Sequence, residues 1–149
     1  MIDTFGYRLM LLVHIFAVIV AFAPAFVWPV ASARLRKTGQ SPSAAWAMAE
    51  WGTPRVYGPA LVIAGLFGFG LTGVSSANNV YSFGDPWISI AMLLWFLMLG
   101  VLFGLLMPAE KKAGAGDAGA VRQVSMFGGI LHLLLAVMLI VMIWKPGFP

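Results

Sequence analysis

The chain contains two histidines, His14 and His132, and both lie within long apolar segments. A titratable side chain inside a bilayer is costly and usually faces other helices, so each imidazole is a candidate for a functional site. At helical spacing each has small residues beside it, namely Ala17 and Ala21 for His14, and Gly128, Gly129 and Ala136 for His132. A flat macrocycle fits beside such an imidazole, and neutral imidazole is an axial ligand of haem iron. The pattern makes haem b a candidate cofactor, with His14 and His132 as candidate axial ligands.

The depths of the two histidines leave three interpretations open. His14 lies about 9 Å along a helix from Arg8, and His132 lies about 20 Å from Lys145. The first and last apolar segments run in opposite directions, so a single haem held by both imidazoles requires strong tilt. We therefore expect neutral histidines that point toward other helices and form hydrogen bonds there. The alternatives are one haem shared by both, or a haem or other ligand held by one of them.

The rest of the sequence offers little for catalysis. It has no cysteine, which removes thiolate metal sites and cysteine nucleophiles, and its five acidic residues are scattered through terminal and connecting segments. No serine or threonine has a recognisable base and orienting partner. The sequence therefore predicts no catalytic residues and no metal site, and we expect the chain not to be an enzyme.

The composition places these residues in a membrane. Of the 149 residues, 61% are hydrophobic and 9% are charged, against about 25% charged in a typical soluble domain. A chain this short cannot bury so much apolar surface, so lipid must cover it. Four apolar runs, roughly 9–33, 56–74, 87–107 and 124–144, each approach the length of about 20 residues that a bilayer requires. The prediction is an all-α, integral membrane four-helix bundle forming a single domain, 1–149.

Pairs of a capping residue and proline predict where helices begin, because proline is favoured at the first helical position. Three such pairs occur, Ser41–Pro42, Thr53–Pro54 and Asp85–Pro86. The last two predict the starts of the second and third spans. The first predicts a short interfacial helix through about Glu50, where Trp46 and Trp51 suit the membrane surface.

The charges predict an orientation. Seven of the nine Lys and Arg residues lie in 34–55 and 108–123, whereas only Arg8 and Lys145 lie on the other side. Loops of the cytoplasmic side carry the excess of cations, so we expect these two loops to be cytoplasmic and both termini to be outside. The basic run ARLRKTG directly follows a span, as an anchor at anionic lipid does, and we expect no nucleic-acid partner.

Small residues recur at helical spacing in every span, and such faces let membrane helices approach closely. The predicted helix-packing residues are Ala17, Ala21, Ala64, Gly68, Thr72, Gly100, Gly104, Gly128, Gly129 and Ala136. Packing within the bundle is the expected role. A ligand groove and a contact with a second copy or a larger membrane complex are the alternatives.

Several segments resemble a known family: LLVHIFAVIVAF, YGPALVIAGLFGFGLTG, DPWISIAMLLWFLMLG and VMIWKPG. Together they are similar to a family of small four-span bacterial membrane proteins without an assigned activity. That family is distantly similar to copper-resistance-D-like proteins and to the four-span haem-type protoporphyrinogen oxidase. The resemblance implies a bacterial plasma (inner) membrane location and a haem-ligand position at His14. The chain departs from the oxidase in having no lysine or histidine in its third span and IFAVIVAF after His14.

These observations predict a small non-catalytic polytopic membrane protein, acting as an accessory, assembly or self-associating subunit. Two alternatives stay open. One is a b-type haem protein for electron transfer or porphyrin handling. The other is a permeation path for a small neutral molecule between the small-residue faces.

Overall fold

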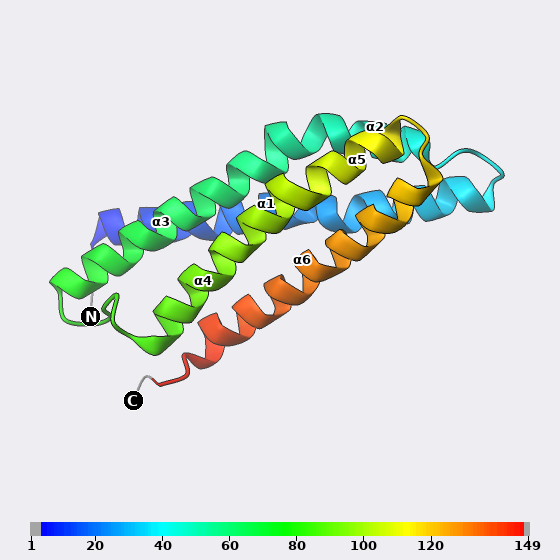
Figure 1. Ribbon diagram of the computed structural model, residues 1–149. Coiled ribbons are helices and arrows are strands. Elements are labelled where there is room, and N and C mark those ends of the chain that lie inside the picture. The colour runs from blue at the N-terminus through cyan, green and yellow to red at the C-terminus, as the bar shows by residue number, and fades with distance from the viewer. Residues whose placement is uncertain (1–3, 148–149) are drawn as a thin grey trace.

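The computed structural model describes residues 4–147, and within them the chain forms only helices, turns and short connections. Four helices are long and apolar enough to cross a membrane, Phe5–Lys37, Ser43–Ala77, Pro86–Gly114 and Ala118–Trp144. Figure 1 shows them as an elongated bundle in which the start of the first helix and the end of the last lie at the same end. The prediction of an all-helical chain with four such helices is confirmed.

The first and last spans are each a single α-helix without a π turn. Helix α1 (Phe5–Lys37) begins after Thr4, whose hydroxyl accepts a hydrogen bond from the backbone N–H of Tyr7. Helix α6 (Ala118–Trp144) begins after Asp117, whose carboxylate accepts from two N–H groups of the first turn. Such caps satisfy backbone donors that have no partner inside the helix.

The second span differs from the sequence prediction. Helix α2 (Ser43–Gly52), the π turn η1 (Thr53–Tyr57) and helix α3 (Gly58–Ala77) form one continuous helix, so no separate interfacial helix exists and Thr53 is no N-cap. Pro54 would normally mark a helix start because it lacks an N–H. Here the backbone N–H of Gly58 reaches back five residues to the Thr53 carbonyl, and the wider turn accommodates the proline without ending the helix.

The third span repeats this construction. Helix α4 (Pro86–Val101) starts at the proline that the sequence indicates, with Asp85 before it, and continues through the π turn η2 (Leu102–Leu106) into helix α5 (Met107–Gly114). The Asp85 carboxylate accepts from the N–H and hydroxyl of Ser82 instead of capping the helix. The predicted loops 34–55 and 108–123 are thus mostly helical, because both helices continue past their apolar runs. Their connections are only 38–42 and 115–117.

The spans pack unequally around the bundle. Helix α1 lies along α3, α2 lies along α5, and α6 packs against both α4 and α5. Contact between α1 and α6 is sparse, so the bundle is open along that side. The largest buried core includes Ala21, Trp46, Leu61, Leu102 and Leu131.

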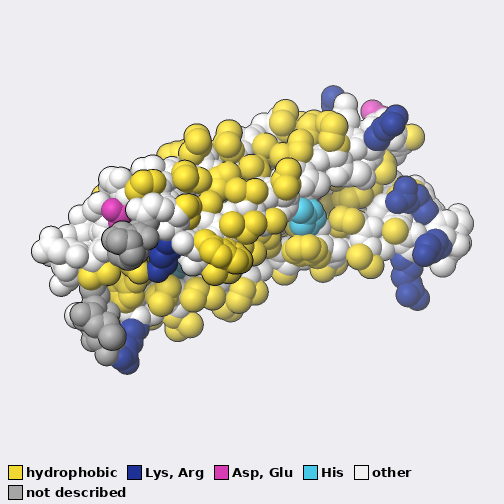
Figure 2. All heavy atoms as spheres, turned by 90° about the horizontal axis from the view of Figure 1, so that it is seen from below, with side chains coloured by type: hydrophobic (Ala, Val, Ile, Leu, Met, Phe, Trp, Pro, Cys, Tyr) yellow, Lys and Arg dark blue, Asp and Glu magenta, His cyan; other side chains and the backbone are white. Residues whose placement is uncertain are grey.

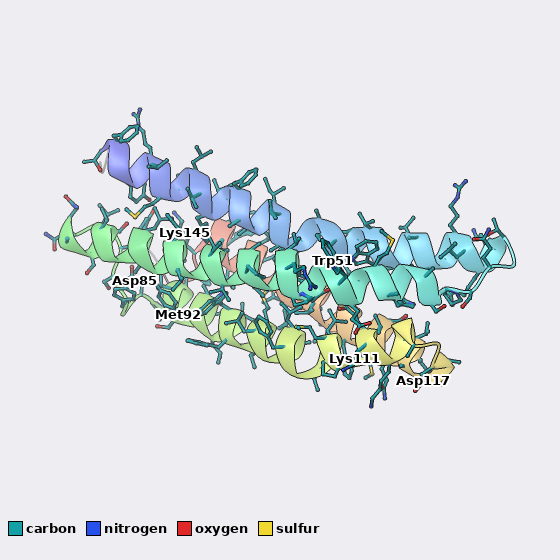
Figure 3. All side chains as sticks on the ribbon, turned by 90° about the horizontal axis from the view of Figure 1, so that it is seen from above. Trp51, Asp85, Met92, Lys111, Asp117 and Lys145 are labelled. Atoms are coloured by element: carbon teal, nitrogen blue, oxygen red, sulfur yellow. The ribbon has the colours of Figure 1, made fainter. Side chains whose placement is uncertain are left out.

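The outer surface suits lipid at its middle and water at its ends. Large exposed apolar side chains occur along all four spans, and Figure 2 shows them in yellow between two ends that carry the charges. In Figure 3, Lys111 and Asp117 lie at one end of the bundle, and Asp85 and Lys145 at the other. Both cation-rich connections share one end of the molecule. Which side of a membrane that end occupies stays a prediction.

At the end opposite the cation-rich connections, Lys145 contacts the connection between α3 and α4. Its backbone is left-handed (φ 44°), which ends α6, and its Nζ donates to the Tyr81 hydroxyl at 2.6 Å. The same ammonium lies 4.5 Å from the centre of the Tyr81 ring and 5.6 Å from that of Trp87. These cation–π contacts tie the end of α6 to the connection between α3 and α4.

Candidate functional site

His14 joins α1 to α3. Its Nδ1 lies 2.7 Å from the carbonyl oxygen of Ala64, and its ring covers Gly68, where an added Cβ would lie 3.3 Å from the imidazole. A carbonyl oxygen can only accept, so Nδ1 carries the proton and donates it. This is the backbone hydrogen bond that the sequence analysis expects of an intramembrane histidine.

The same arrangement occurs between α4 and α3. The Trp95 indole of α4 covers Gly65 and donates from Nε1 to the Leu61 carbonyl at 2.9 Å. In both cases the glycine lies four residues after the accepting carbonyl; a Cβ would overlap the ring at Gly65 and crowd it at Gly68. Two glycines therefore let α3 receive one ring donor from each neighbouring helix.

His132 lies in a different environment. Its ring is 4.5 Å from that of Phe26 on α1, and its Nε2 is buried with no hydrogen-bond partner among the described residues 4–147. Phe26 follows His14 by twelve residues, about 18 Å along α1 at 1.5 Å per residue. The structure therefore does not bring the two histidines together, and a haem bridging them has no geometric support.

A pocket of about 220 Å³ lies inside the bundle next to His132. Its lining comes from α1, α2, α5, α6 and both π turns: Ala25, Trp28, Pro29, Trp46, Tyr57, Leu106, Glu110, Val124, Ser125, Gly128, Gly129, Leu131 and His132. Tyr57 is the last residue of η1 and Leu106 is the last of η2, so both π turns end at the pocket. Wide turns of this kind are frequent at functional sites.

Five polar atoms of this lining are buried without a hydrogen-bond partner in the described part of the chain. They are Trp28 Nε1, Trp46 Nε1, Tyr57 Oη, Glu110 Oε2 and His132 Nε2. Three of these side chains are almost fully enclosed, since Trp46, Tyr57 and Glu110 are 3%, 2% and 3% exposed. An unpaired buried polar group costs about 1–3 kcal/mol, and native proteins contain few of them. Such a concentration around one pocket indicates a site for a polar group from outside the chain.

Two further buried hydroxyls, those of Ser32 and Thr53, also lack partners among residues 4–147. Thr53, Glu50 and Tyr57 each lie near enough to Glu110 to interact with it electrostatically. The Tyr57 ring packs edge-on against Phe22, with 5.8 Å between ring centres. The polar wall is therefore held in place by α1, α2 and η1.

A groove of about 520 Å³ runs beside the pocket, between α1 and α6. It is lined by Ala25, Phe26, Pro29, Val30, His132, Leu135, Ala136 and Leu139, and it shares Ala25, Pro29 and His132 with the pocket. Apart from His132 its lining is apolar, and Phe26, Val30 and Leu139 are exposed on the outer surface. Figure 2 shows an imidazole, in cyan, among apolar side chains on one such face. The groove thus adjoins the pocket at three shared residues and reaches the outer surface of the bundle.

The small residues predicted to pack helices lie in several different environments. Ala17, Ala21 and Ala64 are buried, Gly68 lies under the His14 ring, and the Thr72 hydroxyl donates to the Gly68 carbonyl within its own helix. Gly128 and Gly129 line the pocket and Ala136 lines the groove.

Gly100 and Gly104 differ from the expected contacts within the bundle. Both are exposed, and a Cβ added at either would meet no atom within 4 Å. This face of the third span is therefore on the outer surface of the bundle.

Sequence analysis missed Trp28, Trp46, Tyr57 and Glu110 as site residues. The third apolar run stops near Met107, so the sequence predicts a loop at Glu110, and it predicts a position at the membrane surface for Trp46. The available signal was the helix-forming composition of the two flanking segments, SAAWAMAE at 43–50 and AEKKA at 109–113.

Within residues 4–147 no group of three or more His, Asp or Glu side chains is placed to hold a metal ion. Comparisons of the chain with family models, curated proteins and solved structures found no match. The resemblance to a four-span bacterial family stays a prediction.

Proposed function

We propose that this chain is a non-catalytic membrane protein that binds a small lipid-soluble molecule within its four-helix bundle. The observation that carries the proposal is the set of unpaired buried polar atoms around one pocket. A polar group of a ligand would satisfy them, and the groove between α1 and α6 would admit that ligand from the bilayer. Holding such a molecule is a task for an accessory or assembly subunit.

The arrangement favours binding over catalysis. The titratable side chains of the pocket are Tyr57, Glu110 and His132, one from each of η1, α5 and α6. No hydrogen bond between any two of them occurs among the described residues, so no pair forms the nucleophile–base unit that covalent catalysis uses.

We further propose that the protein lies in a bacterial plasma membrane with 34–55 and 108–123 on the cytoplasmic side. The support is the seven cations that these segments carry. Positive charge accumulates on the cytoplasmic side of membrane proteins because it resists translocation.

The test is to identify which lipid-soluble molecule co-purifies with the protein. Wild-type protein purified in mild detergent is extracted with organic solvent, and the extract is quantified by mass spectrometry. We expect one lipid-soluble molecule per chain in the wild type and at least a fivefold loss in Gly128→Leu. Gly128 lines the pocket and a Cβ there meets no atom within 4 Å, so a larger side chain at this position would take up pocket volume.

Gly100→Leu is the matched control, since Gly100 is equally open but lies outside the pocket. It should keep the wild-type ligand content. A wild-type extract without a stoichiometric molecule, or equal content in Gly128→Leu and Gly100→Leu, contradicts the proposal.

Haem is a second candidate ligand, favoured by the free Nε2 of His132 at the junction of pocket and groove. A neutral imidazole nitrogen without a partner is able to ligate iron. His14 is also a candidate, because its Nδ1 bond to a carbonyl leaves Nε2 unprotonated, as in many ligating histidines. A Soret band in the same preparation, lost in His132→Ala or in His14→Ala, identifies haem and its ligand.

Self-association is supported by a separate observation, the exposed Gly100 and Gly104 on one face of the third span. Four-residue spacing of glycines lets two membrane helices approach closely. If this face pairs two copies, Gly100→Leu converts a dimer to a monomer in light-scattering measurements, with the ligand content unchanged.

A further inference from the structure

The chemistry of the pocket narrows the class of ligand, provided that the proposed binding function holds. The indole N–H groups of Trp28 and Trp46 can only donate, and both are buried without an acceptor in residues 4–147. A ligand that satisfies both must therefore accept two hydrogen bonds, and two carbonyl groups are one way to do so. Tyr57 and His132 add groups that can also donate.

The charge of the wall argues for a neutral headgroup. Among the described residues, the pocket lining contains no Lys or Arg. It does contain one acidic side chain, that of Glu110. A phosphate or carboxylate headgroup would enter without a cation to compensate it and with an acid beside it, which is unfavourable in a low-dielectric site. Neutral acceptors such as carbonyl oxygens meet no such penalty.

The shape of the two cavities argues for a planar head with an apolar tail. Trp28, Trp46 and Tyr57 place aromatic side chains around the pocket. The groove that continues from it is lined by apolar side chains of α1 and α6 and reaches the outer surface. A ring can pack against aromatic walls while its chain follows the groove to the lipid.

From these constraints we propose that the pocket binds a lipid-soluble quinone. Its ring carbonyls accept hydrogen bonds from Trp28 and Trp46, and its tail runs along the groove between Pro29 and Ala136. A quinone combines the neutral charge, the paired carbonyl acceptors, the flat ring and the apolar chain that the cavities require. The proposal concerns binding and includes no redox step.

The first experiment measures the headgroup contacts. Full-length protein in detergent is titrated with decylubiquinone, and the one-to-one complex is quantified by native mass spectrometry. Trp46→Phe and Trp28→Phe keep an aromatic ring but remove the donor, and each should weaken binding about tenfold. Trp51→Phe is the matched control on α2, because Trp51 is exposed and outside the pocket, and it should stay within about twofold of the wild type.

The second experiment measures the tail. Ala136→Phe fills the groove and should weaken decylubiquinone binding at least tenfold. A benzoquinone with the same ring substituents but no chain should bind to this variant as tightly as to the wild type. Val137→Phe is its control, since Val137 is the next residue on α6 and lines neither cavity.

Several results would overturn the proposal. These are the absence of a one-to-one complex, equal effects of Trp46→Phe and Trp51→Phe, or equally tight binding of decylbenzene, which lacks carbonyl groups. Tighter binding of decanoate with the same sensitivity to the variants assigns the site to a carboxylate instead. If Trp46→Phe does not fold, Trp28→Phe decides the headgroup arm.

The failure of this inference is distinguishable from the failure of the proposed function. If the wild type carries a molecule that Gly128→Leu loses, but decylubiquinone neither binds nor displaces it, only the quinone assignment is wrong. If the wild type carries no molecule and binds no quinone, the binding function itself is wrong.

Discussion

At the scale of single residues, two glycines decide how α3 meets its neighbours. His14 and Trp95 donate to carbonyls of α3 over Gly68 and Gly65; a Cβ at Gly65 would overlap the Trp95 ring, and one at Gly68 would lie 3.3 Å from the His14 ring. Helices in lipid gain little from hiding apolar surface from one another, so such donors and close approaches are what hold them together. A small side chain in place of one of these glycines should therefore lower the stability of the protein.

We expect Gly65→Ala to destabilise the protein by about 1–3 kcal/mol, since overpacking of this kind has costs in that range. The new Cβ would overlap the Trp95 ring, which would have to move away and lose its hydrogen bond to Leu61. Thermal unfolding in detergent, followed by circular dichroism, measures the effect. Gly73→Ala is the control on the same helix, where a Cβ meets nothing within 4 Å. Equal unfolding temperatures of the two variants would show that the ring has room to shift.

At the scale of elements, two continuous helices with π turns replace what look like separate segments in the sequence. The extensions α2 and α5 pack on each other closely enough that a Cβ at Gly114 would lie 3.0 Å from the Ala47 Cα. The two extensions supply Trp46 and Glu110 to the pocket. The spacing of α2 and α5 therefore sets the width of the candidate site.

Gly114→Leu should separate these two elements, because the opposing atoms belong to the Ala47 backbone and cannot rotate aside. We expect a lower unfolding temperature, with a cost of about 1–3 kcal/mol, together with a loss of the bound molecule. Thermal unfolding and the extraction assay measure the two effects. Gly104→Leu, on the same span but facing outward, should keep the bound molecule, and any change in its unfolding temperature would come from the face proposed to pair two copies. A Gly114→Leu protein that keeps wild-type stability and ligand content would refute the close α2–α5 contact.

At the scale of the whole molecule, the two ends of the bundle differ in charge, and its sides differ in how closely the helices pack. Along its length, one end carries the connections rich in cations and the other is closed by Lys145 against Tyr81 and Trp87. Around its girth, α1 and α6 barely touch, whereas every other pair of successive spans is in contact. The first difference predicts the orientation in the membrane, and the second is where the proposed ligand would enter.

The orientation is testable by labelling, and the absence of cysteine from the sequence makes the wild type a clean blank. We expect a membrane-impermeant maleimide to label Phe83→Cys in intact bacterial spheroplasts, and to label Gln40→Cys and Ala115→Cys only after the membrane is opened. All three positions are exposed, and they lie at opposite ends of the bundle. The reverse pattern would place the cation-rich end outside the cell.

The sequence by itself determines that this chain forms four apolar helices, because hydrophobicity and span length depend only on residues close in sequence. It also indicates that both histidines lie within spans and where the third span begins, at Pro86. It could not give the continuity of the second span, because a proline starts a helix or is absorbed by a π turn according to what packs around it.

Only the tertiary structure decided which polar side chains meet. His14 and His132 resemble each other in the sequence, yet one donates to α3 and the other borders a pocket beside α1. Trp28, Trp46, Tyr57 and Glu110 come from separate elements and form one wall only after α2 and α5 pack together. The physical reason is that burial of a polar atom without a partner depends on every neighbouring helix, and no local stretch of sequence contains that information.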